Sequence, residues 1–493
     1  MQTRHTLALA LCCGSASIAA AQPISWAAGS GPWGNASNWN PVNVPDNAGE
    51  DAILGGGSAY TVSLATAPAI SPTIGSLMIT NPLAALSIEG GRTLTLNAAS
   101  SSNHGLIQLN PNGAGSAALL SVAAPVTLGG TGQVQMVAGG GFSQINATAG
   151  ATLTNGPGHT IRGVGNINAT LLNQGTIRAD SSISLTGTTL LLQTGMKANN
   201  ASIEAAGGST LAISGITLDQ TGGGALLADG GDISLRSAAV LGGSINATGT
   251  GLLEITTGTC RLDSVTLNIP TDIVGGRNLV ISGPGLPNNN ILRINPNLGG
   301  VGTILRFDNS GVLGGTGQVQ MVAGGVFSQL NTAAGATITH DAPHTIRGVG
   351  QVNAGLINNS TITADGQPGV PLQLRVEDKT NNAVLEAAPD SDLWIDSITI
   401  DQTGGGSINA TGAGSLISLR SATILGGSIN ATGTGLLEIT TGTCRLDSVT
   451  LNTPTDIVGG RNLVISGPGL PNNDLLRINP NLGGTGTILR FDN

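Results

Sequence analysis

A long segment of this sequence occurs twice almost unchanged, and this duplication constrains the fold more than any other feature. The run Leu241–Asn268, LGGSINATGTGLLEITTGTCRLDSVTLN, reappears without a difference as Leu425–Asn452. A second block, LGGTGQVQMVAGG, begins at both Leu128 and Leu313. A repeat of this length that is built from shorter strand-and-turn units is typical of a stacked solenoid.

The composition favours thin repetitive layers over one large core. Charged residues make up 9% of the 493 residues, against about 25% in typical soluble domains. Aromatic residues make up 2%, and the apolar content is Ala, Val, Ile and Leu in short runs. The only lysines are Lys197 and Lys379, and the formal net charge is −9. Without a basic patch to neutralise phosphates, nucleic acid is not expected as a partner.

The first 21 residues are predicted to be a secretory signal peptide. Arg4 and His5 supply a short positive region, Leu7–Ala20 is apolar and small, and small residues precede a cleavage site before Gln22. A buried N-terminal helix and a lipoprotein signal at Cys12 are the alternatives. Elsewhere no stretch approaches the ~18 apolar residues of a membrane helix, so no transmembrane segment is predicted.

Residues 22–60 are predicted to form an N-terminal cap rich in tryptophan. Trp26, Trp33 and Trp39 are three of the four tryptophans in the chain. Bulky side chains at this point would cover the open end of a stack whose interior is otherwise aliphatic. The alternative is an aromatic carbohydrate-binding site.

Beyond the cap, short apolar runs alternate with turn residues through a first section, 61–309, and its near-duplicate, 310–493. Within each run the pattern has period two, which predicts strands with one buried face. We expect regularly spaced strands at Leu252–Ile255, Val265–Ile269, Leu279–Ile281, Ile291–Ile294 and Ile304–Phe307. The intervening turns are expected at Thr257–Thr259, Pro270–Asp272, Ser282–Gly285 and Asn295–Gly300.

These features predict an all-β fold, a parallel β-helix whose coils of about 20–25 residues stack ~4.8 Å apart. A string of antiparallel β-sandwiches is the structural alternative. In the β-helix, Cys260 and Cys444 occupy equivalent positions and would lie roughly 35–45 Å apart, too far for a disulfide. They are interpreted as small core residues, with a reactive free thiol as the alternative.

No residue is assigned a catalytic, cofactor-binding or metal-binding role. His159 and His344 occur once per copy, which predicts a structural role in turns because zinc needs three or four converging ligands. Pro343 separates His340 from His344, so these two are not a helical pair. Three acidic groups could suit calcium but are interpreted as solvated turn carboxylates: Asp46, Glu50 and Asp51; Asp229 and Asp232; and Asp390 and Asp392.

A polysaccharide lyase or glycoside hydrolase of the β-helix type is the enzymatic alternative. Its charged side chains would come from Arg261, Asp263, Asp272 and Arg277, which recur as Arg445, Asp447, Asp456 and Arg461. Catalysis needs such groups to converge on one face. A duplicated set is typical of a structural ladder, so the chain is predicted not to be an enzyme.

Polar residues at fixed positions predict outward rows on the solenoid. Gln133 and Gln135 recur as Gln318 and Gln320. Several N-x-S/T triplets are interpreted as turns and asparagine ladders, with glycan attachment as the alternative. They include Asn146, Asn168, Asn246, Asn359, Asn409 and Asn430.

The sequence resembles secreted bacterial repeat proteins of the autotransporter-passenger and haemagglutinin type. The resemblance rests on the opening WAAGSGPWGNASNWNPVNVPDNAGEDAIL and on coils such as Leu153–Asp180 and Ile424–Asn452. It implies a secreted or surface-exposed β-solenoid with an adhesive or structural role, and carbohydrate or a host or neighbouring cell surface as partner. The sequence ends in RFDN without an evident cap, so either further coils or end-to-end self-association is expected to cover that edge.

Overall fold

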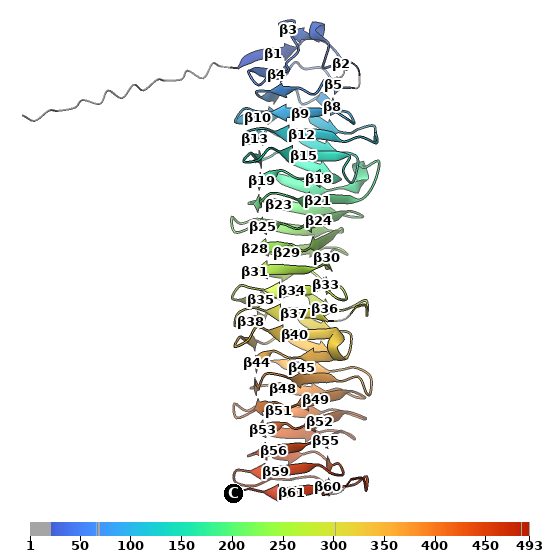
Figure 1. The fold of residues 1–493 in the computed structure, drawn as a ribbon, viewed down its shortest axis with the longest axis vertical. Coiled ribbons are helices and arrows are strands. Elements are labelled where there is room, and N and C mark those ends of the chain that lie inside the picture. Colours follow the sequence, from blue (N-terminus) through green and yellow to red (C-terminus); the bar gives the residue numbers. More distant parts are fainter. Residues whose placement is uncertain (1–20, 66, 68–69, 301, 485, 493) are drawn as a thin grey trace, which may run out of the picture.

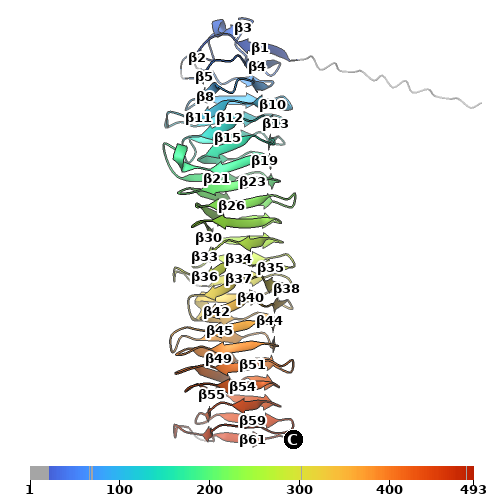
Figure 2. The same ribbon diagram turned by 180° about the vertical axis from the view of Figure 1, so that it is seen from behind.

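The chain forms a β-solenoid of about 20 turns, which confirms the predicted all-β parallel β-helix. The computed structural model describes residues 21–492, except 66, 68–69, 301 and 485. Nearly all of the predicted signal peptide therefore lies outside the described residues. In Figures 1 and 2 the coils form an upright rod of nearly constant width, with the first strands at the top and the C-terminal coils at the bottom.

From β4 (Glu50–Leu54) to β57 (Thr450–Asn452), each coil contributes one strand to each of three faces. The first face is a single 22-stranded sheet that includes β4 and ends at β60 (Leu476–Ile478). The second face starts with β2 (Gly31–Pro32) and is an 11-stranded sheet followed by a 10-stranded sheet, joined by an isolated bridge between Leu267 and Asn288. The third face runs from β6 (Thr73–Ile74) to β57. With the exception of β3, all paired strands are parallel to their neighbours.

The core consists of aliphatic ladders that run along the rod axis. On the second face, β26 (Ala225–Asp229), β29 (Ser244–Thr248) and β32 (Thr266–Asn268) pair in register, which aligns Leu226, Ile245 and Leu267. All three side chains are fully buried. Along each strand, the residues that alternate with these buried ones face outward, as expected for strands with one buried face.

The structure corrects the predicted strand spacing. Thr271 and Asp272 are predicted in a turn, but they lie in β33 (Thr271–Ile273), because this strand pairs in parallel with β30 (Leu252–Thr257) and β36 (Ile291–Ile294) of the adjacent coils. The expected spacing also omits β31 (Thr259–Asp263) and β35 (Gly285–Pro287), whose polar and turn-forming residues do not resemble a strand.

Coil length also varies more than expected. The coil that starts at Thr160 returns to the same face at Thr176, its partner in the next coil. The coil that starts at Gln22 is much longer, since its partner in the next coil is Glu50. Corner loops of different length therefore leave the strand register intact.

The N-terminal cap closes the first coil with a cluster of tryptophans. β1 (Gln22–Trp26) pairs in parallel with β4, and β3 (Trp39–Asn40) pairs antiparallel to β1 at the end of the sheet. Trp33 and Trp39 are almost fully buried, with ring centroids 4.8 Å apart. The aromatic bulk therefore covers the end of the aliphatic stack, as predicted.

The second copy of the repeat is displaced around the rod by one face. β29 lies on the second face, whereas its counterpart β54 (Ser428–Ala431) lies on the third. β30 (Leu252–Thr257) lies on the third face, whereas its counterpart β55 (Leu436–Thr441) lies on the first. In each case the counterpart comes 25 strands later, which is eight coils of three strands and one strand more.

Identical turns therefore form different corners of the solenoid. The backbone conformation is preserved despite this change, since Ser264 and Ser448 have φ of 57° and 58° and Gly258 and Gly442 have φ of 65° and 66°. Local sequence fixes each turn, and each coil contacts only its immediate neighbours. It follows that each of these turns fits two of the three corners.

Deletion of residues 241–424 is expected to leave a folded, shorter solenoid. The identical runs fuse without a change in local sequence, and β54 then stacks on β26, the neighbour that β29 has now. Circular dichroism per residue should be unchanged, and small-angle scattering should show a rod shorter by about 40 Å, eight coils at ~4.8 Å. An aggregated or unfolded product would show that contacts beyond neighbouring coils are essential.

Candidate functional site

The tryptophans of the cap are not available as a carbohydrate platform. Trp26 is 8% exposed, and all three indole N–H groups donate to backbone carbonyls, those of Gly29, Pro45 and Trp33. Trp26 also stacks on Tyr60, with centroids 6.4 Å apart. A sugar-binding aromatic needs an open ring face, so the structure favours the capping role.

His159, His340 and His344 lie inside the solenoid, beside a spine of buried amides. Asn155 Nδ2 donates to Asn173 Oδ1 (2.8 Å), and Asn173 Nδ2 donates to Asn199 Oδ1 (2.8 Å). His159 Nδ1 lies 2.7 Å from Asn155 Oδ1 at the start of this spine. The second copy repeats the spine through Asn358, whose Nδ2 donates to Asn381 Oδ1 (2.9 Å). Buried amides that pair with each other avoid the cost of unsatisfied polar groups.

The second copy differs because His340 replaces Asn155. The His340 and His344 rings are fully buried, with centroids 5.4 Å apart in an edge-to-face arrangement. Burial lowers the pKa of His159 to about 4, and burial together with His340 lowers that of His344 to about 3. Within the part of the chain that the structure describes, no three His, Cys, Asp or Glu side chains gather as a metal site would require.

Both lysines are buried, a feature that the sequence analysis missed. Lys197 and Lys379 take the place of aliphatic residues in inward ladders, Lys379 between Leu356 and Ile400. Their Nζ atoms donate to carbonyls of the adjoining turns, such as Gln193 O (3.0 Å) for Lys197. Burial lowers the pKa of Lys197 to about 8 and that of Lys379 to about 7. In the runs K-A-N and K-T-N, the lysine stands two residues before an inward asparagine. This period-two spacing is the signal that could have placed both lysines on the buried face.

The acidic groups hold turns and neighbouring coils together. Glu50 accepts from Asn43 Nδ2 (2.7 Å) and from Asp46 N (2.9 Å). Asp229 pairs with Arg178 at 2.9 Å. Glu50 is buried at the start of β4 and Asp229 ends β26, so neither is a solvated turn carboxylate as predicted. Both are bonded within the solenoid by these contacts instead.

The structure does not bring together the four charged residues of the enzymatic alternative. Arg261 pairs with Asp308 (3.1 Å), and Asp272 accepts from Arg293 Nε (2.6 Å). Arg277 Nε donates to Thr256 O (2.9 Å). Arg261 lies on the first face in β31 and Asp272 on the third face in β33. The second copy repeats these partners with Arg445–Asp492, Asp456–Arg477 and Arg461–Thr440 O.

The outward surface carries two equivalent rows of asparagines, called here the amide ladders. Successive side chains in each row are hydrogen-bonded from Nδ2 to Oδ1 at 2.7–2.9 Å. The ladders consist of Asn246, Asn268 and Asn289 on the second face, and of Asn409, Asn430, Asn452 and Asn473 on the third. The predicted asparagine ladder is thereby confirmed for Asn246, Asn409 and Asn430. Shorter rows confirm it for Asn168, which donates to Asn146 Oδ1 (2.8 Å), and for Asn359, which accepts from Asn382 Nδ2 (2.9 Å).

Glutamines extend the polar surface. Gln133 and Gln135 lie half-buried and outward in β14 (Gln133–Met136) on the second face, where Gln108 Nε2 donates to Gln135 Oε1 (3.1 Å). Their counterparts Gln318 and Gln320 lie in β39 (Gln318–Met321) on the third face. The same surface chemistry is therefore presented twice, on two sides of the rod.

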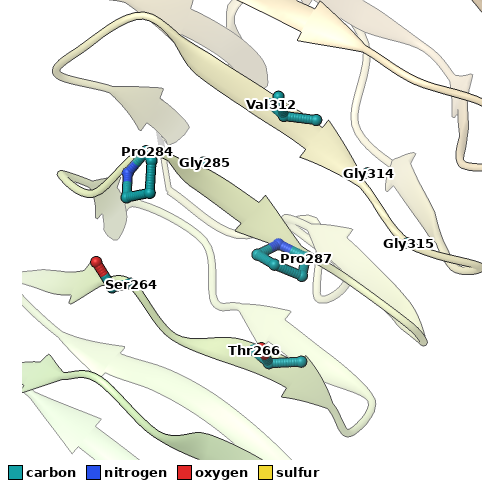
Figure 3. Close-up of a pocket in the computed structure, with 8 residues that line it drawn as sticks. All are labelled: Ser264, Thr266, Pro284, Gly285, Pro287, Val312, Gly314 and Gly315. Carbon is teal, nitrogen blue, oxygen red and sulfur yellow. The ribbon is translucent and has the colours of Figure 1, made fainter. Parts of the chain in front are cut away.

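A shallow apolar groove of about 360 Å³ interrupts the second face between β32 and β35. Figure 3 shows Pro287 on β35 and Pro284 just before this strand, with Val312 above them and Thr266 below. Proline has no N–H to donate, so β35 cannot complete the ladder with β32 and the sheet breaks at this point. The groove is lined mainly by carbon and carries no charged side chain among its lining residues.

We expect stability to fall as the pH drops below about 6.5. The folded protein keeps His159 and His344 neutral, whereas the unfolded chain protonates them near pH 6.5, so the unfolded state binds more protons. The loss should be about 1–2 kcal/mol per histidine between pH 7 and pH 5. Urea denaturation of His159→Asn/His344→Asn should show a flatter pH dependence, whereas exposed His104→Asn should not. An unchanged slope in the double variant would contradict the assignment.

Cys260 and Cys444 are unpaired and buried, as predicted. Burial raises the pKa of both thiols. Because the thiolate is the reactive form, iodoacetamide should label neither cysteine in the native protein and both after denaturation. Mass spectrometry of the intact chain measures this, and rapid native labelling would support the reactive-thiol alternative.

No helix in the described residues is long and apolar enough to span a bilayer. Comparison of the chain with protein-family models, with curated proteins and with solved structures found no match.

Proposed function

We propose that this protein is a secreted or surface-exposed, non-catalytic β-solenoid that acts as a structural rod and as an adhesin-like binding surface. The observation that carries the proposal is the recurrence of the amide ladder on two faces. Its rows of Asn246 and Asn430 are flanked by the hydroxyls of Ser244 and Ser428, which accept hydrogen bonds from these amides.

The chemistry of the ladders suits neutral carbohydrate on a host or neighbouring cell. Amides both donate and accept, as sugar hydroxyls do, and neither ladder contains a charged residue. Single contacts of this kind are weak, but a row repeated every ~4.8 Å allows many at once. Because the two ladders lie on different faces, one rod is able to hold two polymer chains on different sides.

Two further features support this proposal. The resemblance to autotransporter passengers and haemagglutinins agrees with a long solenoid, and the signal-like residues 1–21 agree with secretion. The charged side chains of the enzymatic alternative are bonded in separate pairs, which favours a structural role for them.

The test is binding of the full chain to immobilised neutral polysaccharides. Replacing the asparagines of either ladder with alanine should weaken binding, and replacing both should weaken it by at least about tenfold, because the avidity is lost. Asn382→Ala is the matched control, since it is an exposed amide bonded to Asn359 outside the ladders.

Two results would contradict the proposal. Binding that does not respond to the ladder variants would remove the ladders as the binding surface. Turnover of acidic polysaccharides that is lost in Asp263→Asn or Asp447→Asn would instead establish the carbohydrate-active enzyme.

A further inference from the structure

The two copies differ in one loop at a corner of the solenoid. In the first copy, Asp180–Thr188 connects β20 (Thr176–Ala179) to β21 (Thr189–Gln193). In the second copy, Asp365–Pro371 connects β45 (Thr361–Ala364) to β46 (Leu372–Arg375). Nine residues separate Asp180 from the buried Leu190, but only six separate Asp365 from its counterpart Leu372.

The longer loop of the first copy seals the surface beneath it. Leu185 N donates to Val137 O (2.9 Å), and Gly139 N donates to Thr186 O (2.9 Å). These bonds accompany an isolated parallel bridge between Ala138 and Thr186. Val137 is 6% exposed and Ala138 is 1% exposed, so the loop acts as a short added strand that covers them.

The shorter loop of the second copy leaves the equivalent surface uncovered. Val322, Ala323 and Gly324 correspond to Val137, Ala138 and Gly139. Among the described residues, neither Val322 O nor Gly324 N has a hydrogen-bond partner, and Val322 is only half-buried. The result is a groove of about 570 Å³, a volume within the usual range for ligand sites.

Apolar side chains form most of this groove, and Asp365 and Gln367 complete its side-chain lining. Phe327 and Leu298 line it and are 42% and 69% exposed, and Val349 contributes a further aliphatic surface. Leu298 takes the place of Gly113, where an added Cβ would lie 3.3 Å from Leu185 Cδ1 in the first copy. An aliphatic side chain in the position of Leu185 would therefore find more apolar surface in the second copy than it has in the first.

We propose that this groove binds an extended peptide segment of a partner protein, with an aliphatic residue in the position that Leu185 occupies in the first copy. The peptide donates a backbone N–H to Val322 O and accepts from Gly324 N, as the first-copy loop does at Val137 and Gly139. Addition of a strand to free backbone groups is a general mode of peptide recognition. This site is separate from the amide ladders.

Val370 regulates access to the groove. A Cβ placed on Gly324 would lie 2.5 Å from Val370 Cγ1, whereas one placed on Gly139 would lie 2.5 Å from Thr186 O. The Val370 side chain thus occupies the place of the strand carbonyl. It is 37% exposed, so it has room to rotate outward when a peptide binds.

The test uses the peptide SSISLTGTT, residues 181–189, labelled with a fluorophore and titrated with the full chain. Anisotropy should report saturable binding, and Val370→Ala should strengthen it by removing the side chain that blocks the groove. The same peptide with Leu185→Asp should bind at least about tenfold more weakly, since its carboxylate would be buried among apolar side chains in a groove that already holds the like-charged Asp365.

A loop graft provides the matched control. Replacing residues 366–371 with residues 181–189 should close the groove and abolish binding, with circular dichroism to verify that the graft is folded. Failure of both the native chain and Val370→Ala to bind would overturn the proposal. Equal binding of the Leu185→Asp peptide, or of the folded graft, would overturn it as well.

Discussion

The structure depends on the stacking of each coil on its two neighbours. One residue costs about 1–2 kcal/mol of backbone entropy to order, and one buried aliphatic side chain returns about 1.5–3 kcal/mol. A single coil with a handful of inward aliphatics does not offset this cost by itself. Backbone ladders and aliphatic columns between coils supply the remainder, and they do so only between neighbours.

This dependence on neighbours explains how a long duplication is accommodated out of phase. In a domain with a single core, a repeat that ended one strand out of step would place its side chains against the wrong partners. Here β54 meets β51 (Ser407–Ala410) with Ile429 on Ile408, much as β29 meets β26 with Ile245 on Leu226. Similar local contacts form on both faces. The outward asparagines and glutamines of the second copy therefore lie on a different face from those of the first, while the core stays continuous.

The sequence was sufficient for the architecture and for the outward rows, because both depend on period-two alternation that is visible in single strands. It was insufficient for the number of strands in each repeat. β33 carries Thr271 and Asp272 directly after Pro270, and β35 contains Pro287, so each looks like a turn when taken alone. Their strand character comes from pairing with adjacent coils, and the displacement by one face depends on counting them correctly.

Buried polar residues were misjudged for a related reason. Asn173 and Lys197 occupy inward positions where the alternation calls for an aliphatic residue. Asn173 is acceptable there because the next coil offers Asn199 at hydrogen-bond distance, and Lys197 because a turn directs carbonyls toward its ammonium group. The alternation does not show these partners, so composition alone suggests turns and a solvated surface.

In this periodic scaffold, the two copies differ most clearly in a corner loop. The strands of the two copies are nearly interchangeable, since they present similar ladders to similar neighbours. The corner loops do not have to stack on neighbouring coils in this way. The longer connection Asp180–Leu190 covers Val137, whereas the shorter connection Asp365–Leu372 leaves Val322 half-buried. The difference in loop length therefore separates a covered strand contact in one copy from an open groove in the other. The coils of the core stay the same in both, because the segment that closes the groove is not one of the stacked strands.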